Sequence, residues 1–465
     1  MSPDYLTAEA KRENAIALAS ALGIDVAEAA STLDLFILVT ADDRDQSALR
    51  LAEECVSLLS RTVQCASEIS RERHASAELV IGCARQRTEA PAVRVDVLID
   101  RIVIGREVEN SAPCARVPPI LSLLGACYAS AAAFHYAIGG RLATGIQEPL
   151  VIEFAQLGVI ASDLEGPVDI GRAYLAGAGA IGNGFLWAAR FLNIRGQIDI
   201  ADDDVVSSGN LNRQIWFESR DVGLGKADRL ASLAQPHLPQ LRLVPRPVRL
   251  QDLPERSEGP WLEKLIVAVD SRRARRALQN EFPGEVFDAS TTDIREVVVS
   301  YNRQPWNAAC LSCIYEPDQE EHSRERHISE HLGVSLQAVR AERISERDAL
   351  TIAGKFPGLA AADLVGMAYD SLFKRLCAES ALQTQEGKRV VAPFAFVSVL
   401  AGTMLALEVV RRRQSAANIQ DNYWRLSPWH SPLGRRRVTR PRQIDCSFCA
   451  NPVLQRVNES LWKRP

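Results

Sequence analysis

The chain has 465 residues, of which 47% are apolar and 24% are charged, and its formal net charge is −4. This is the usual balance of a soluble globular protein, and the length indicates two or three domains rather than one. Because 54 basic side chains are matched by 58 acidic ones, the composition argues against a nucleic-acid-binding protein.

The N-terminus and one apolar stretch bear on membrane association. Residues 1–15 mix acidic and basic side chains and contain no apolar core, which is unlike a secretory signal. Residues 117–140 carry no formal charge and are long enough to span a bilayer. This stretch is rich in Ala, Ser and Gly and includes His135, so we interpret it as a buried helix. We therefore expect a cytoplasmic protein without a membrane partner.

Residues 1–165 alternate helical and strand-like patterns and predict an N-terminal α/β domain. Apolar runs at 35–40 and 79–83 indicate short strands, and the alternation at 93–104 indicates one strand or a pair. No glycine-rich nucleotide loop occurs in this segment.

A glycine-rich loop opens the second segment, residues 166–313, which follows a βαβ rhythm. Gly177, Gly179 and Gly182 form the pattern GxGxxG between a run of strand-forming residues and an apolar helix. Such glycines permit a tight turn and close approach of the backbone to phosphate, and the helix N-terminus attracts an anion. About twenty positions further on, Asp202 ends the next predicted strand, where a carboxylate can accept both ribose hydroxyls. This combination predicts an adenine nucleotide, but it favours NAD or FAD as readily as ATP.

Charged side chains after Asp202 favour ATP over NAD or FAD as the nucleotide. Cutting ATP between its α and β phosphates builds negative charge on the bridging oxygen and the pyrophosphate, so fixed cations must face it. Arg213 and Lys226 can supply two such charges, and Asn210 lies beside the first. Asp270 ends the next predicted strand and can hold the magnesium ion that bridges the phosphates. The joint order of these residues predicts ATP and Mg²⁺ as cofactors.

Residues 314–390 are charged and helical in pattern, and they predict a helical insert in the nucleotide domain, which resumes at 391–465. A second apolar helix is predicted at 392–413, and it ends in basic residues, as the helix dipole favours. This helix is similar to the one that begins near Pro118, since both are Ala-rich and both close an α/β segment. The similarity indicates two related halves, of which the first has lost its nucleotide loop.

Two C-x-x-C pairs predict a metal site, Cys310 with Cys313 and Cys446 with Cys449. Four thiolates suit tetrahedral zinc, and because no open coordination position is evident, we interpret the zinc as structural. It would tie the C-terminal tail to the end of the nucleotide domain. A redox-active pair is the alternative interpretation, and the presence of two matched pairs disfavours it.

The order of these motifs resembles that of the E1-like superfamily, which includes ThiF- and MoeB-type adenylyltransferases and ubiquitin-activating enzymes. The resemblance covers residues 177–270 and the cysteine pairs, and no motif of residues 1–165 matches. It implies an α/β fold in which a Rossmann-like adenylation domain with a helical cysteine-bearing insert follows a second, degenerate adenylation-like domain. It also implies roles for the nucleotide site: ribose binding by Asp202, phosphate contacts by Asn210, Arg213 and Lys226, and magnesium or α-phosphate binding by Asp270, with Arg275 close by.

A catalytic cysteine is implied by the same resemblance. Enzymes of this family generally carry an acceptor cysteine between the first zinc pair and the following long helix, and only Cys377 lies in that interval. The cations Lys374 and Arg375 beside it favour a reactive thiolate, whereas a position at a helix C-terminus disfavours one. The alternative is an ordinary half-buried cysteine of a helix.

The helical bulk of the insert looks closest to the E1-like enzymes of bacterial Bil-type antiphage operons. The implied function is ATP-dependent adenylation of the C-terminal glycine of a ubiquitin-like β-grasp protein, thioester transfer to Cys377, and handover to an E2-like conjugating enzyme in antiviral defence. The alternatives are adenylation for sulfur transfer or peptide modification without a thioester, a non-catalytic scaffold, and an NAD oxidoreductase. An oxidoreductase leaves Arg213 and Lys226 without a role. A homodimer or an intramolecular pair of adenylation folds is compatible with the family.

Overall fold

The computed structural model describes residues 5–67, 74–109, 116–257, 259–304, 308–317, 319–341, 343–369, 372–373, 376, 392–414 and 419–462. The chain forms two compact units. The first comprises Met1–Ile314 and Val391–Pro465, and the second comprises Tyr315–Val390.

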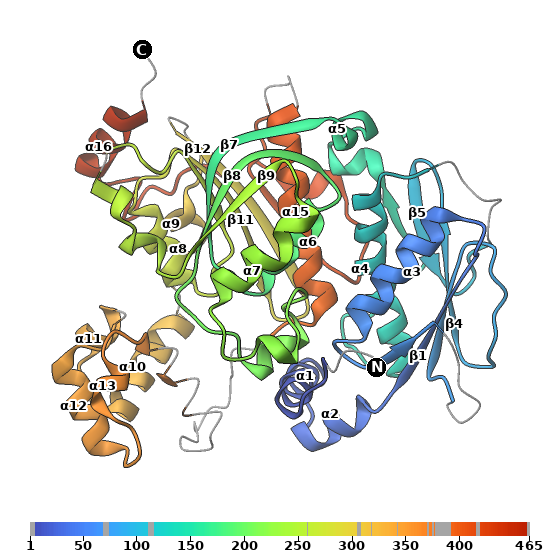
Figure 1. The fold of residues 1–465 in the computed structure, drawn as a ribbon, viewed down its shortest axis with the longest axis horizontal. Helices are drawn as coiled ribbons and strands as arrows, with labels where there is room; N and C mark the ends of the chain where they lie inside the picture. Colours follow the sequence, from blue (N-terminus) through green and yellow to red (C-terminus); the bar gives the residue numbers. More distant parts are fainter. Residues whose placement is uncertain are drawn as a thin grey trace. The chain divides into compact units, whose positions relative to one another are not determined.

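The N-terminal half of the first unit consists of helices on a six-stranded sheet (Figure 1). Its elements are α1 (Ala8–Leu22), α2 (Val26–Thr32), β1 (Phe36–Ala41), α3 (Gln46–Leu59), β2 (Gln64–Ala66), β3 (Ala77–Ile81), β4 (Ala92–Val97), β5 (Arg101–Gly105), α4 (Pro119–Ala137) and β6 (Leu150–Glu153). The sheet order is β2-β1-β3-β4-β5-β6, in which β1 to β4 run parallel and β5 and β6 pair antiparallel. The three strand predictions for this half are confirmed, the alternation at 93–104 being the pair β4 and β5.

The C-terminal half of the first unit is built on an eight-stranded sheet in the order β14-β13-β12-β11-β10-β7-β8-β9. The strands are β7 (Pro167–Ala176), β8 (Asn193–Ala201), β9 (Leu241–Arg246), β10 (Lys264–Val267), β11 (Glu285–Thr292), β12 (Glu296–Arg303), β13 (Tyr423–Leu426) and β14 (Arg437–Val438). The helices are α5 (Ala161–Glu165), α6 (Ala180–Ala189), α7 (Lys226–Ala234), α8 (Arg272–Gln279), α9 (Leu311–Ile314), α15 (Ala395–Gln414) and α16 (Pro452–Trp462). Strands β7 to β11 are parallel and the remaining pairings are antiparallel.

The two sheets share one topology. The order β2-β1-β3-β4-β5-β6 repeats as β8-β7-β10-β11-β12-β13, with the same sequence of parallel and antiparallel pairings. Helix α3 follows the first strand of its half as α6 does in the other, and both α4 and α15 immediately precede the strand at the far edge of this shared order. The fold-class prediction of two successive α/β domains is confirmed, and the weak similarity between the two apolar helices reflects equivalent places in the two sheets.

Helix α4 contains most of the apolar stretch at 117–140. It is long and apolar enough to cross a membrane, and 89% of its most apolar window is buried inside the protein. The prediction of a buried helix is confirmed.

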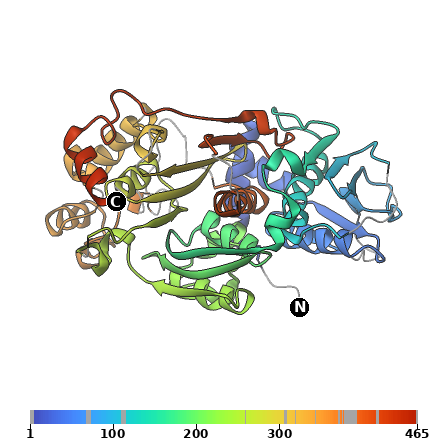
Figure 2. The ribbon, with the colours of Figure 1, turned by 90° about the horizontal axis from the view of Figure 1, so that it is seen from above.

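Helices α6 and α15 cross with their backbones in direct contact. A Cβ atom built on Gly402 of α15 would overlap the backbone of Gly184 and Phe185 in α6, and one built on Gly184 would lie 2.8 Å from the carbonyl oxygen of Ser398. Figure 2 looks nearly along α15, which lies in the middle of the first unit and packs on both α6 and α4. Only glycine permits such an approach, because any side chain at the crossing would push the helices apart.

The second unit consists of short helices around a small apolar core of its own. They are α10 (Gln319–Leu332), α11 (Leu336–Arg340), α12 (Glu346–Lys355) and α13 (Ala361–Leu364). Helix α13 ends at Leu364. Gly366 adopts a positive φ of 80°, a conformation that ends a helix, and Arg343 forms an isolated bridge with Ala368.

We expect Gly402→Ala to lower the free energy of unfolding by about 1–3 kcal/mol or more, because its new methyl group meets the backbone of α6 rather than a side chain that can move. The matched control is Gly354→Ala in α12, where a Cβ meets no atom within 4 Å. That variant should be unchanged or more stable by about 0.5–1 kcal/mol. Urea unfolding of both variants measures the difference, and equal effects would contradict the close crossing.

Candidate functional site

The candidate nucleotide site lies at the carboxyl ends of β7, β8 and β10. The chain passes from β7 outward to β8 and β9, and then returns to the other side of β7 with β10 and β11. The strand order therefore reverses between β7 and β10. In open parallel sheets this reversal leaves a crevice at the carboxyl ends of the strands, where ligands bind.

The three glycines of the loop after β7 have different surroundings. Gly177 has a φ of 101°, and a Cβ there would lie 2.8 Å from the carbonyl oxygen of Ala268. A Cβ on Gly182 would overlap the carbonyl oxygen of Gly177. A Cβ on Gly179, in contrast, would meet no atom within 4 Å. The outer glycines are thus required by the protein's own packing, whereas Gly179 at the N-terminus of α6 faces open space in which an anion can approach.

Asn183, which is not part of the predicted motif, holds this loop in its conformation through hydrogen bonds. Its buried side-chain amide donates to the carbonyl oxygens of Ala178 and Gly179 at 2.9 and 3.0 Å. Its Oδ1 accepts the backbone N–H of Trp216 at 3.1 Å. The phosphate loop is therefore hydrogen-bonded to the segment that follows Arg213. A polar residue inside an apolar helix was the available signal, since a buried amide needs partners.

Asp202 lies directly after β8 and beside the glycine loop. Its carboxylate accepts the backbone N–H groups of Ala178 at 2.7 Å and Asp204 at 2.9 Å. Burial raises the pKa of Asp202 to about 6, and the nearby positive charge of Lys226 opposes this shift. The group is therefore largely ionised at pH 7 and can accept hydrogen bonds from a ligand.

Asn210 and Arg213 lie in and just after a 3₁₀ turn, Ser208–Asn212. Asn210 uses its Oδ1 to accept the backbone N–H of Ser207, so it stabilises the turn. The side chain of Arg213 is 19% exposed, and its Nη1 donates to Gly209 O and to Asn212 Oδ1.

Burial lowers the pKa of Arg213, and the carboxylates of Glu13 and Asp270 oppose that shift. Glu13 Oε2 lies 4.0 Å from Arg213 Nη1. The structure therefore brings Arg213 near Asp270, as the sequence predicted for one site, and adds an acidic residue of the N-terminal half.

Lys226 is the first residue of α7, and its side chain is 10% exposed. Its Nζ forms an ion pair with Asp204 Oδ2 at 2.8 Å. Asp204 is not among the predicted site residues. The two residues are 22 positions apart, and no motif along the chain indicates their pairing.

Asp270 is exposed and lies between β10 and α8, at the same edge of the sheet as Asp202. Arg275, which was expected close to the phosphates, is buried, and its guanidinium is hydrogen-bonded to other residues of the protein. Its Nε donates to Asp288 at 2.9 Å and its Nη2 donates to the carbonyl oxygen of Ala289 at 2.8 Å. Asp202 thus contacts the glycine loop, Lys226 lies near Asp202, and Arg213 lies near Asp270, whereas Arg275 acts inside the fold.

In the N-terminal half, the loop after β1 is equivalent to the glycine loop after β7, but it is acidic. After β1 the chain continues with Asp42, Asp43, Arg44 and Asp45 in place of glycines. Asp45 caps α3 by accepting the N–H groups of Ser47 and Ala48 at 2.8 and 3.1 Å. Because these N–H groups are the ones that would bind a phosphate, the anion site of this half is already filled by a carboxylate.

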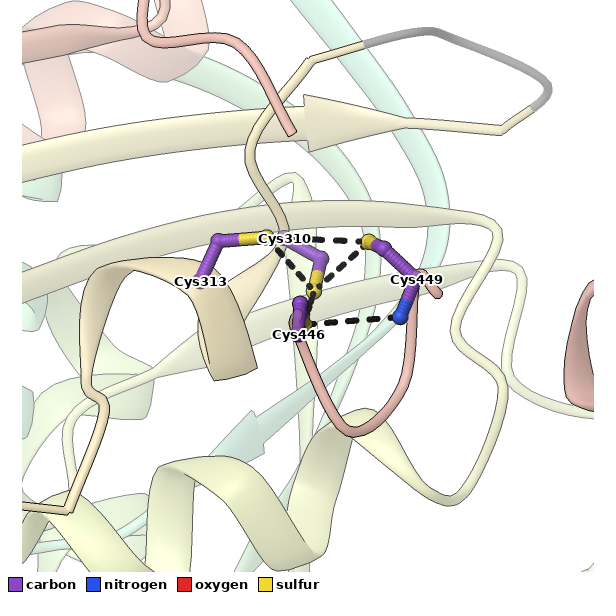
Figure 3. A group of neighbouring side chains, drawn as sticks. All are labelled: Cys310, Cys313, Cys446 and Cys449. Carbon is purple, nitrogen blue, oxygen red and sulfur yellow. Dashed lines mark hydrogen bonds between the residues drawn. The ribbon is translucent and has the colours of Figure 1, made fainter. Parts of the chain in front are cut away.

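Four cysteines from two distant segments converge at the end of the first unit (Figure 3). Their sulfur atoms all lie within 4.8 Å of one another. Three of the separations are 3.7, 3.8 and 3.7 Å, close to the edge of about 3.8 Å expected for a tetrahedron with 2.3 Å metal–sulfur bonds, and a fourth, between Cys310 and Cys449, is shorter at 3.2 Å. Backbone N–H groups of Gln443 and Cys449 point at Cys313 and Cys446. The donor set fits a closed tetrahedral ion such as zinc, held by Cys310, Cys313, Cys446 and Cys449.

Cys377, the predicted acceptor cysteine, lies outside the described residues.

Comparisons with known families match both halves of the chain. Residues 167–448 match the model of the ThiF family, and residues 7–160 match the model of the E1 N-terminal domain.

Three relatives show the range of similarity. An uncharacterized protein of Sinorhizobium fredii, y4jF, is 30% identical over 260 residues, which cover 53% of this chain and 49% of that protein. The NEDD8-activating enzyme E1 catalytic subunit of Dictyostelium discoideum is 32% identical over 106 residues, 23% of each chain. Ubiquitin-like modifier-activating enzyme 7 of Mus musculus is 33% identical over 128 residues, 26% of this chain and 13% of that one. The matches thus span about half the length of the first relative and less of the others.

Among solved structures, E. coli MccB with ATP aligns at a TM-score of 0.35 and 14% sequence identity, covering 74% of this chain and 75% of that one. The family assignment therefore depends on the sequence matches.

We expect the purified chain to contain about one zinc ion, and Cys310→Ser to lose it together with a fall in melting temperature, because three thiolates no longer close a tetrahedral site. Elemental analysis and thermal unfolding measure the two effects. Cys83→Ser, a half-buried cysteine outside the cluster, is the matched control and should keep the metal. A wild-type chain that carries no metal after growth with zinc would contradict the assignment.

Proposed function

The chain belongs to the ThiF family, and from that premise we propose that it is an ATP-dependent adenylyltransferase that activates the C-terminal glycine of a ubiquitin-like β-grasp protein. In this reaction a carboxylate oxygen of the glycine attacks the α-phosphorus of ATP. The bond between the α-phosphorus and the bridging oxygen breaks, and pyrophosphate leaves. The products are an acyl-adenylate and pyrophosphate.

The observation that carries the proposal is the placement of two cations and two carboxylates around one glycine loop. Gly179 and the N-terminus of α6 offer N–H groups to the phosphates, and ionised Asp202 can accept the ribose hydroxyls. Arg213 and Lys226 would face the charge that builds on the leaving pyrophosphate. Asp270 would hold Mg²⁺, which neutralises phosphate charge when bound.

Both cations have carboxylate neighbours within the chain. Arg213 faces Glu13 at 4.0 Å, and Lys226 is paired with Asp204 at 2.8 Å. Such pairs keep the cations in place without an unpaired charge in a largely buried site. In our proposal the phosphates of ATP replace these carboxylates as partners, because a triphosphate offers more charge and more acceptor oxygens.

The N-terminal half would not bind a second nucleotide. Its equivalent helix terminus is capped by Asp45, and Asp42 and Asp43 add negative charge where phosphates would lie. We propose that this half is an inactive adenylation-like domain, with boundaries near 1–165. The chain would thus carry an intramolecular pair of folds with one working site.

Zinc held by the four cysteines would have a structural role in this enzyme. All four positions of the tetrahedron would be filled by sulfur, so no position remains for water or substrate. The ion would join the end of the nucleotide domain to the C-terminal tail.

Thioester transfer is the second step of the proposal. The thiolate of Cys377 would attack the acyl-adenylate carbonyl, releasing AMP, and an E2-like conjugating enzyme would then accept the protein. The resemblance to Bil-type enzymes supports a place in bacterial antiphage defence and in the cytoplasm. Sulfur transfer or peptide modification without a thioester is the alternative, and a stable acyl-adenylate with no enzyme adduct would favour it.

We expect Arg213→Ala and Asp270→Ala each to lower ATP–pyrophosphate exchange by about 100-fold or more, because each removes a fixed charge facing the phosphates or the magnesium ion. The assay uses the full chain, Mg·ATP, labelled pyrophosphate and a ubiquitin-like protein with a C-terminal glycine. Arg220→Ala is the matched control, since this exposed arginine of the neighbouring turn pairs with Glu218. Wild-type exchange in either variant would overturn the assigned roles.

Cys377→Ala should abolish a thiol-sensitive adduct between the chain and the ubiquitin-like protein while leaving pyrophosphate exchange intact, because exchange requires only the first step. Non-reducing and reducing gels of the reaction distinguish the two. An adduct that persists in the variant removes Cys377 from the mechanism.

A further inference from the structure

The segment that carries Arg213 is held by two buried polar residues of the N-terminal half. We propose that Asn14 and Arg61 are positioning residues for Arg213, so that the inactive half assembles the nucleotide site of the active one. This inference rests on the proposed function, because it assigns Arg213 to the phosphates of ATP.

Asn14 orients Arg213 through one intervening side chain. Asn14, on α1, is fully buried, and its Nδ2 donates to the carbonyl oxygens of Arg61 at 2.9 Å and Thr62 at 3.3 Å. Its Oδ1 accepts Nδ2 of Asn212 at 2.9 Å. Asn212 Oδ1 is then directed at Arg213 Nη1, 2.7 Å away. The orientation of each amide follows from its neighbour, because only one arrangement pairs every donor with an acceptor.

Arg61 holds the backbone of the same segment. Its side chain, 2% exposed, follows α3, and its guanidinium donates to four carbonyl oxygens within seven residues of the segment. These acceptors are Leu211 at 2.7 Å, Gln214 at 3.2 Å, Ile215 at 2.7 Å and Phe217 at 2.9 Å. They lie on both sides of Arg213, so one planar cation determines the path of the chain through that residue.

The cost of burying the Arg61 guanidinium indicates that this residue positions the backbone and does not only fill space in the core. Desolvation lowers the pKa of Arg61 to about 10, so burying this charge opposes folding. Four carbonyl dipoles and the ring of Tyr5, whose centroid is 4.0 Å from the guanidinium carbon, compensate for the lost water. An apolar side chain would join two domains without this cost, but it could not bind backbone carbonyls.

The same segment reaches the phosphate loop. The N–H of Trp216 donates to Asn183, which holds the carbonyl oxygens of Ala178 and Gly179. A displacement of the segment held by Arg61 would therefore move both Arg213 and the glycine loop. Two sets of contacts, one to a side chain and one to the backbone, converge on Arg213.

A double-mutant cycle on Mg·ATP binding tests the role of Asn14. Calorimetry on the full chain compares wild type, Asn14→Ala, Arg213→Ala and the double variant. We expect Asn14→Ala to weaken binding about tenfold, and to have no further effect once Arg213 is absent, because it acts through that residue. Arg101→Ala, which removes a surface ion pair with Asp100 in the same half, is the control and should bind as wild type.

Two outcomes of the cycle are decisive against the proposal. Wild-type affinity in Asn14→Ala, or an equal loss in both backgrounds, overturns the inference while the proposed function stands. A wild-type chain that does not bind Mg·ATP overturns both.

Hydrogen exchange tests Arg61 without any ligand. We expect Arg61→Met to speed amide exchange in residues 207–217 about tenfold or more relative to the N-terminal half, and Arg61→Lys to lie between it and wild type, since lysine is a shorter, non-planar donor. Exchange that rises equally in residues 207–217 and throughout the N-terminal half, or that is unchanged at 207–217, would show that Arg61 only supports the fold.

Discussion

The crossing of α6 and α15 is the constraint on which the first unit depends. Gly184 and Gly402 let two helix backbones touch, and the N-terminus of α6 carries the phosphate loop. Helix α15 also packs on α4 of the other half, and the ring of Phe134 in α4 lies against that of Phe394, just before α15, with centroids 4.9 Å apart and planes tilted by 56°. One helix that follows the insert thus sets the position of the nucleotide loop and joins the two sheets. A contact made by backbone rather than by side chains has little freedom to adjust, so the loop is held rigidly.

The two sheets share one topology but differ in a few residues at equivalent places. In the C-terminal half, the first strand is followed by glycines, and the helix terminus remains open at Gly179. In the N-terminal half the same terminus is closed by Asp45. Two buried polar side chains of that half, Asn14 and Arg61, donate to or accept from the segment that carries Arg213. In our proposal the N-terminal half thus serves as a scaffold for the nucleotide site of the other half.

The insert and the metal cluster are related through chain connectivity. Cys313 and Cys446 lie on either side of the second unit and of α15, and the sulfur cluster brings these distant points together. Both cysteine pairs belong to the first unit, one before the insert and the other after α15. A metal ion held by these four thiolates would stabilise the folded chain, because the complete set of ligands comes together only on folding.

The sequence by itself determined the features that depend on local backbone geometry and on spacing: the glycine loop, the acid after the next strand, the cysteine pairs and the two apolar helices. Glycine conformations and ligand spacings act over a few residues, so they can be read along the chain. Only the tertiary structure decided the partners. It brought Asn14 into hydrogen bonding with Asn212, 198 residues away, and Arg61 with Leu211, 150 residues away. It also paired Lys226 with Asp204 and buried Arg275 against Asp288. The hydrogen-bond partners of buried polar groups depend on which surfaces of the two halves pack together, and a local sequence pattern does not show this.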